Sequence, residues 1–262
     1  MLVDTHCHLD AAEFDGDRSA VAAAAMQAGV GLIVVPAIER ANFGAVASVC
    51  RDHPYCAAAY GIHPMYVARA READLDALRV TIRREHPLAV GEIGLDRFIE
   101  PRDDAQQEFY FSAQLKIARD TELPVLLHTR RAVDAVLKQL RLCRVSGGIA
   151  HAFSGSRQQA DEFIKLGFKL GFGGAMTFPR ASRIRQLAAT LPLDAIVLET
   201  DAPDIPPEWI IAADKQRARN TPDQLPRIAQ TLAGLRGIAM QEVAEATTAN
   251  ATAVLSGLAR IH

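Results

Sequence analysis

The chain has 262 residues and a formal net charge of −2. That balance excludes a strongly basic nucleic-acid coat protein, but it is compatible with a local phosphate-binding site. The four cysteines show no paired spacing and no C-x-x-C motif, so we expect free thiols in a reducing, cytoplasmic environment. No apolar run approaches the roughly 18 residues of a membrane span, and no basic segment followed by a long apolar one opens the chain. We therefore expect neither a transmembrane helix nor a signal peptide.

Short apolar runs alternate with longer segments rich in alanine, leucine and charged residues. The short runs are predicted strands, at residues 2–6, 31–36, 56–61, 88–94, 124–128, 147–151, 168–173 and 195–200. The segments between them, such as 17–29 and 108–120, have helical patterns. Eight strands that alternate with helices predict an α/β fold in which a parallel sheet closes as a (β/α)8 TIM barrel. A doubly wound open sheet is the alternative, because a count of eight strands from one sequence can be off by one.

The segment after the last predicted strand begins with a long, proline-punctuated loop over residues 202–222. Two further helices are predicted beyond it, over 223–236 and 240–256. No linker-like, repeated or low-complexity stretch divides the chain. We therefore expect a single domain over residues 1–262, and we expect it to be a monomer.

Five of the eight histidines lie at or just after the C-terminal ends of predicted strands, namely His6, His8, His63, His128 and His151. Glu92 and Asp201 occupy equivalent places on the fourth and eighth strands. Because the active site of a (β/α)8 barrel lies at these strand ends, we expect all seven side chains to share one mouth. His53 and His86 instead precede strands, where we expect structural roles, and His262 ends the chain.

His6 and His8 are separated by one residue at the end of the first predicted strand. Side chains two residues apart in a strand point to the same face, so both imidazoles can serve one metal ion. An isolated pair of this kind is also compatible with two hydrogen-bonded core histidines. Metal binding is favoured here because further histidines and carboxylates recur at equivalent strand ends.

The expected metal ligands are His6, His8, Glu92, His128, His151 and Asp201. A mixed set of histidines and carboxylates suits catalytic Zn²⁺, Mn²⁺ or Mg²⁺, whereas a closed structural zinc site would favour cysteine. Six donors exceed the needs of one tetrahedral ion and fit two ions about 3.5–4 Å apart that share a carboxylate. We expect Glu92 to be this bridge and Asp201 to act also as the general base. His63 is expected to contact substrate or protonate the leaving group, unless it is a rim histidine capped by Pro64.

Basic side chains follow several of the same strands, at Arg97, Arg102, Arg130, Arg131, Arg180, Arg183, Arg185, Lys215, Arg217 and Arg219. Guanidinium groups around a two-metal site suit an anionic phosphate substrate. For any single arginine, ordinary solvated surface is the simpler interpretation. Arg130, two residues after His128, is the exception that we expect to contact substrate. The glycine-rich nucleotide-binding motifs and the serine-nucleophile motif G-x-S-x-G are absent from the sequence.

Six motifs occur in the order and spacing of one known family: DTHCHLD, GIHP, GEIGLD, LLHTR, HAFSGS and ETDAPD. Through them the chain resembles the TatD family of metal-dependent hydrolases, and most closely its YjjV-type branch. The resemblance extends over essentially the whole chain, including the RNTP segment at 219–222. It implies a (β/α)8 barrel of the amidohydrolase-superfamily type. It also implies a deoxyribonuclease activity, described in the family as a 3′–5′ exonuclease or an endonuclease.

The resemblance also assigns roles to residues. It implies a first ion bound by His6, His8, Glu92 and Asp201. It implies a second ion bound by Glu92, His128 and His151. It places His63 near the scissile phosphate, and Arg130 and Asn220 near the substrate. Asp204 departs from the family pattern, because other branches often carry an aromatic residue there and an acid disfavours the stacking of a base.

We therefore predict a divalent-metal-dependent hydrolase that cleaves phosphodiester bonds of DNA, bound at the barrel rim, with a metal-activated water. One alternative is an ester, amide or lactone hydrolase, for example of an aminoacyl-tRNA ester, because the fold does not fix the substrate. The other is a metal-binding barrel that acts mainly through a partner. The complete set of candidate ligands favours an enzyme.

Overall fold

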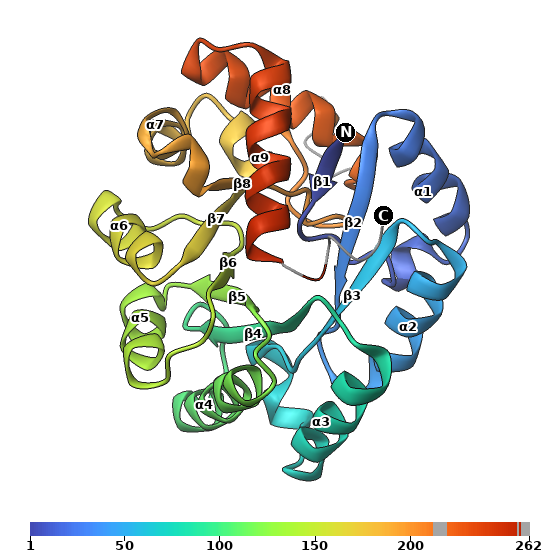
Figure 1. Cartoon of the computed structure of the whole chain (residues 1–262), viewed down its shortest axis with the longest axis vertical. Coiled ribbons are helices and arrows are strands. Elements are labelled where there is room, and N and C mark those ends of the chain that lie inside the picture. Colours follow the sequence, from blue (N-terminus) through green and yellow to red (C-terminus); the bar gives the residue numbers. More distant parts are fainter. Residues whose placement is uncertain (212–218, 256, 258–262) are drawn as a thin grey trace.

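The computed structural model of the chain describes residues 1–211, 219–255 and 257 (Figure 1). Its eight strands form one sheet, with β1 (Leu2–Asp4), β2 (Val30–Pro36), β3 (Cys56–Tyr60), β4 (Ala89–Asp96), β5 (Val125–Arg130), β6 (Gly148–Ala150), β7 (Phe168–Phe172) and β8 (Ile196–Leu198). Each strand pairs in parallel with the next one along the chain. This sequential order confirms the TIM barrel and excludes the doubly wound sheet, whose strand order reverses.

Among the described residues, eight helices surround the sheet, namely α1 (Arg18–Gln27), α2 (Phe43–Asp52), α3 (Ala73–Glu85), α4 (Asp104–Asp120), α5 (Val133–Leu142), α6 (Arg157–Lys165), α7 (Ser182–Thr190) and α8 (Leu225–Arg236) (Figure 1). The helix predicted over 108–120 begins one turn earlier, because the carboxylate of Asp103 accepts a hydrogen bond from the Gln106 N–H and caps it. None of the helices in the described ranges is long and apolar enough to cross a bilayer.

Short 3₁₀ turns occupy several connections, at η1 (Ala12–Phe14), η2 (Arg40–Asn42), η3 (Pro64–Arg69), η4 (Gly174–Thr177), η5 (Leu193–Ala195), η6 (Glu208–Ile210) and η7 (Pro222–Gln224). The predicted loop over 202–222 therefore contains η6 and the start of η7. Lys215 and Arg217 of that loop, like His262, lie outside the described residues.

The last helix, α9 (Met240–Val254), crosses the N-terminal end of the barrel and appears in red in front of the strands (Figure 1). Ala251 and Leu255 pack against the side chains that fill the barrel interior, which include Leu32, Ala57, Leu88, Leu126, Ile149 and Val197. The side-chain amide of Asn250 donates hydrogen bonds to the carbonyls of Leu193 (2.8 Å) and Ile196 (2.7 Å) at the start of β8. Helix α9 therefore covers the N-terminal end of the barrel, opposite the strand ends at which the functional residues are predicted.

Strands β8 and β1 are joined by hydrogen bonds beyond their ends. The Thr5 N–H donates to the Leu198 carbonyl (3.0 Å), and the Asp201 N–H donates to the His6 carbonyl (2.8 Å). The buried Asp4 accepts from the Thr200 N–H (3.0 Å), and its second oxygen lies 2.5 Å from the Thr200 hydroxyl. The Thr200 hydroxyl donates to that second oxygen. Burial raises the pKa of Asp4 to about 8, although the hydrogen bonds from Thr200 oppose this shift. This seam explains why the segments predicted over 2–6 and 195–200 are extended although their ladder strands are shorter.

Candidate active site

Glu92, buried on β4, lies at the centre of the C-terminal mouth. Its Oε2 atom is 3.1 Å from Nε2 of His6 and 3.6 Å from Nε2 of His8. Asp201 faces the same two imidazoles, with its Oδ1 atom 3.6 Å from Nε2 of His6 and 3.8 Å from Nε2 of His8. The structure therefore brings three of the predicted ligands together on one side of the Glu92 carboxylate, which is the fourth.

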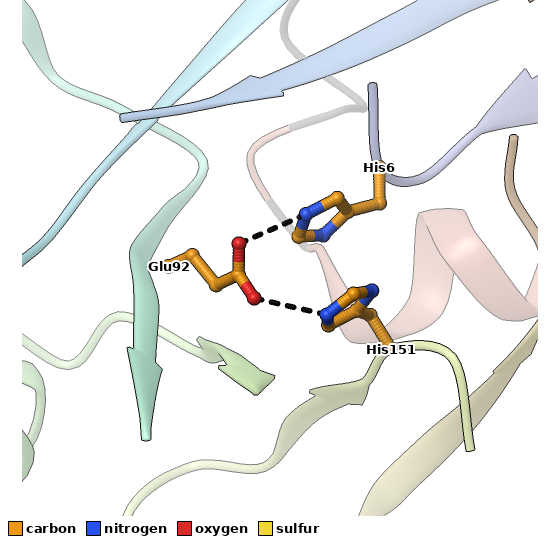
Figure 2. Close-up of side chains that lie close together, drawn as sticks. All are labelled: His6, Glu92 and His151. Carbon is orange, nitrogen blue, oxygen red and sulfur yellow. Dashed lines mark hydrogen bonds and ion pairs between the residues drawn. The ribbon is translucent and has the colours of Figure 1, made fainter. Parts of the chain in front are cut away.

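The other oxygen of Glu92 faces a second set of imidazoles. Its Oε1 atom is 2.9 Å from Nε2 of His151, 3.0 Å from Nδ1 of His128 and 3.3 Å from Nε2 of His63. Figure 2 shows the carboxylate between His6 and His151, with one oxygen directed at each. All seven side chains predicted to share one mouth thus lie together, the other six around the Glu92 carboxylate.

His6 and His8 converge although β1 ends at Asp4, before either of them. The chain stays extended because its N–H groups bond alternately to the two neighbours. Cys7 N–H donates to the Val34 carbonyl (3.0 Å) and His8 N–H donates to the Ala202 carbonyl (2.8 Å). The alternation of side chains therefore persists past the ladder, and the two Nε2 atoms lie 3.3 Å apart.

Two carboxylates behind the histidines were missed by the sequence analysis. Asp96, the last residue of β4, places Oδ2 2.9 Å from Nε2 of His128. Glu199, buried just after β8, has Oε1 3.7 Å from Nδ1 of His151 and accepts a hydrogen bond from the Ala152 N–H (2.6 Å). A carboxylate on one ring nitrogen fixes which nitrogen is directed at the centre. The sequence could have indicated both residues, because Asp96 ends the GEIGLD motif and Glu199 begins the ETDAPD motif, each at the end of a predicted strand.

The charge distribution favours an ionised Glu92 carboxylate, and the rings around it differ in charge. The carboxylates that face His128 and His151 outweigh the burial of these rings and raise the pKa of both, that of His151 well above its usual value. Burial lowers the pKa of His6 to about 3 and that of His63 to about 4. Burial raises the pKa of Glu92, but the facing imidazoles of His63, His151 and His6 outweigh it and hold that pKa well below its usual value. Burial raises the pKa of Asp201 to about 6, so its carboxyl is ionised at neutral pH.

The site contains more nitrogen and oxygen atoms that face one another than there are ring protons to form hydrogen bonds between them. Nε2 of His6 faces both Nε2 of His8 and Oε2 of Glu92, and one ring proton can serve only one of them. Within the described ranges, three sets of donor atoms lie within 4.8 Å of one another: His6, Glu92 and His151; His6, His8 and Asp201; His63, Glu92 and His128. Convergent imidazole and carboxylate donors are what a divalent cation requires, so these residues fit a metal centre.

The residues predicted to contact substrate differ in accessibility. Arg130 is exposed at the end of β5, with its guanidinium carbon 3.7 Å from the centre of the Phe98 ring. Asn220 is fully buried, and its amide donates to the carbonyls of Thr200 (2.8 Å) and Asp204 (2.9 Å). The structure thus shows Asn220 holding the loop after β8, and a direct contact between Asn220 and substrate stays a prediction.

Several arginines expected around the mouth already pair with carboxylates. Arg97 lies 3.2 Å from Glu108, Arg102 lies 2.8 Å from Asp104, and Arg219 lies 2.6 Å from Asp17. The predicted ring of guanidinium groups is therefore only partly free for a substrate.

A parallel (β/α)8 barrel whose C-terminal mouth gathers imidazoles and carboxylates around one buried glutamate has the architecture of a metal-dependent hydrolase. The family model of TatD-related DNases matches residues 3–256. The chain therefore belongs to the TatD family and is a metal-dependent hydrolase.

Individual relatives agree with this assignment. The chain is 41% identical over 254 residues to the uncharacterized metal-dependent hydrolase YjjV of Escherichia coli K12, with 95% of each chain covered. It is 31% identical over 258 residues to the protein of Erwinia tasmaniensis named 3′-5′ ssDNA/RNA exonuclease TatD, covering 95% of this chain and 98% of that one. The crystal structure of E. coli YjjV, a TatD homologue, matches with a TM-score of 0.91 at 39% identity and covers 97% of both chains.

Proposed function

We propose that this chain is a deoxyribonuclease that cleaves phosphodiester bonds of DNA as a 3′–5′ exonuclease, with two divalent metal ions. The observation that carries the proposal is the Glu92 carboxylate, whose two oxygens face two separate sets of imidazoles. The name of the Erwinia relative, 3′-5′ ssDNA/RNA exonuclease, adds support for a nuclease and for the polarity of cleavage.

Two ions, as Mg²⁺, Mn²⁺ or Zn²⁺, match the two halves of the site. The first would be held by His6, His8, Asp201 and one oxygen of Glu92, and the second by His128, His151 and the other oxygen of Glu92. Ions bound there supply Lewis acidity, which lowers the pKa of a water and stabilises charge on the phosphoryl oxygens.

The chain's own residues then handle the protons. Oδ1 of Asp201 faces His6 and His8, which leaves Oδ2 to accept the proton of the attacking water. Nδ1 of His63 accepts a hydrogen bond from the Met65 N–H (3.1 Å), so the ring proton lies on Nε2. In the structure that N–H faces Oε1 of Glu92 (3.3 Å). It would be released to stabilise the leaving oxygen when a metal ion occupies Oε1, which favours the substrate role of His63 over a ligand role. The proposed role of Arg130, which is exposed at the end of β5, is to bind a substrate phosphate.

We also propose that the chain acts as a monomeric, single-domain protein in the cytoplasm. All four cysteines are free thiols in the structure, as a reducing compartment requires. Light scattering on the purified protein should give the mass of one chain, and a mass of two chains would contradict the monomer.

The test of the nuclease is hydrolysis of single-stranded DNA labelled at its 3′ or 5′ end. The protein is treated with EDTA, and Mg²⁺, Mn²⁺ or Zn²⁺ is added back. We expect metal-dependent shortening with early loss of the 3′ label. Asp201→Asn should abolish it, whereas Asp194→Asn, which removes an exposed carboxylate before the same strand at the opposite end of the barrel, should not.

Other outcomes would identify the alternatives. The exposed Asp204 lies three residues after Asp201, and a carboxylate there disfavours an approaching phosphate, which favours an ester, amide or lactone substrate as the second candidate. A folded, metal-loaded protein that cleaves no DNA but releases a carboxylic acid from such a substrate would establish it. Partner binding that survives in Asp201→Asn, without hydrolysis of any substrate, would favour a barrel that acts through a partner.

A further inference from the structure

An exposed aromatic side chain at the mouth is covered by two arginines. Phe98 follows β4 by two residues and remains 44% exposed. The guanidinium carbons of Arg130 and Arg131 lie 3.7 Å and 4.5 Å from the centre of its ring. Phe109 on α4 has a similar exposure of 47%, but no arginine of the described chain stacks on its ring. The cluster at Phe98 therefore differs from an ordinary exposed phenylalanine.

Asp96 connects this cluster to the candidate metal centre. One oxygen of Asp96 lies 2.9 Å from Nε2 of His128. The other accepts hydrogen bonds from the N–H groups of Phe98 (2.7 Å) and Ile99 (3.1 Å). The Arg97 N–H also donates to the Arg130 carbonyl (2.9 Å), which joins the two segments. The position of Phe98 is thus fixed relative to His128 by short, partly buried contacts.

The two guanidinium groups retain hydrogen-bonding capacity. Among the described residues neither Arg130 nor Arg131 forms an ion pair, in contrast to Arg97 and Arg102 on the same side of the barrel. A guanidinium stacked on a ring keeps its N–H groups in its own plane, directed away from the ring. These donors can therefore bind an anion while the stack persists.

We propose that Phe98, Arg130 and Arg131 form a nucleotide subsite for single-stranded DNA beside the metal centre. A base stacks on the flat surface formed by the Phe98 ring and the guanidinium groups, and the free guanidinium N–H groups bind the adjoining phosphate. An unpaired base is required, because a base within a duplex has no free face. The subsite rests on the proposed nuclease function and specifies its substrate as a single strand.

Fluorescence anisotropy with a short, fluorescein-labelled single-stranded DNA tests the stacking. Phosphorothioate linkages slow its cleavage, and the full-length protein is loaded with Mg²⁺. Phe98→Leu should weaken binding about ten-fold, whereas Phe98→Tyr keeps the ring and should retain affinity. Phe109→Leu is the matched control and should bind as the wild type does. On an oligonucleotide that lacks its bases, Phe98→Leu should have no effect.

The salt dependence of binding tests the phosphate contacts. Each contact to a single strand contributes about −0.7 to the slope of log K against log salt. Arg130→Gln and Arg131→Gln should each make the slope shallower by about this amount. Arg144→Gln, an exposed arginine that follows α5 at the opposite end of the barrel, should leave it unchanged.

The outcomes separate the subsite from the nuclease proposal. Cleavage by the wild type combined with unchanged binding by Phe98→Leu would overturn the subsite and leave the nuclease standing. Binding that depends on Phe98 without cleavage would support the subsite and overturn the nuclease. Equal weakening of intact and base-free DNA by the arginine variants, with no effect of Phe98→Leu, would indicate a charged rim only and would overturn the stacking.

Discussion

Asp96 acts on the candidate centre through the tautomer of His128. Its carboxylate can accept a hydrogen bond from the Nε2–H of His128, which leaves Nδ1 without a proton and able to bind a metal ion beside Glu92. In Asp96→Asn the retained carbonyl can still accept from Phe98 and Ile99, but the new amide donates to Nε2 and moves the ring proton to Nδ1. We expect metal affinity to fall by about 10- to 100-fold, the usual effect of losing a carboxylate that orients a metal-binding histidine. Competition with a chromogenic chelator measures it, and unchanged affinity in a folded variant would contradict this role.

The carboxylate of Glu199 fits in the structure only because residue 171 is a glycine. A β-carbon at Gly171 would lie 2.1 Å from Oε2 of Glu199, so Gly171→Ala must displace this buried carboxylate from His151. We expect the free energy of unfolding to fall by about 1–3 kcal/mol, as in other overpacked interiors. Gly234→Ala is the control, because nothing lies within 4 Å of a β-carbon at that exposed site on α8. It should be neutral or stabilising by up to about 1 kcal/mol. Urea titration of both variants checks the contrast.

At the scale of elements, α9 stabilises the end of the barrel opposite the site. Asn250 satisfies two carbonyls at the start of β8, and Asn250→Ala would leave both without this donor. We expect a loss of about 1–3 kcal/mol in the free energy of unfolding with metal affinity unchanged. Thr252→Ala, which removes an exposed hydroxyl from the same helix, should change stability little. A parallel loss of metal affinity in Asn250→Ala would show that the two ends of the barrel are coupled.

The elements could be predicted because their periodicity is local, whereas their contacts are not. All eight predicted strands are present, with boundaries within two residues of those observed. The candidate ligands could be found because parallel strands bring their C-terminal ends to one mouth. Asp96 and Glu199 were missed because an acid at a strand end resembles a solvated one until its histidine partner is known. The position of α9 was also beyond prediction, since a helical pattern does not say which end of a barrel it covers.

For the whole molecule, metal binding and folding stability are linked. The donor atoms come from segments at the ends of β1, β3, β4, β5, β6 and β8, so the complete centre exists only in the folded chain. An ion that binds only the folded state stabilises it by about 2.7 kcal/mol at a concentration 100 times its Kd. We expect the Tm to rise with added Mn²⁺ or Zn²⁺ and to fall in EDTA. Asp201→Asn should shift this response to higher metal concentration, and an unchanged Tm after EDTA treatment would argue against ions held by these donors.

The net charge sets the expected salt dependence of DNA binding. A chain with a net charge of −2, and with Arg97, Arg102 and Arg219 already paired, offers few free cations to phosphates. Because each contact to a single strand contributes about −0.7 to the slope of log K against log salt, three or so contacts predict a slope near −2. Anisotropy across a salt series measures it. A slope near −6 or steeper would require roughly eight or more phosphate contacts and a basic surface far beyond the mouth. It would therefore place most of the binding energy away from the metal centre.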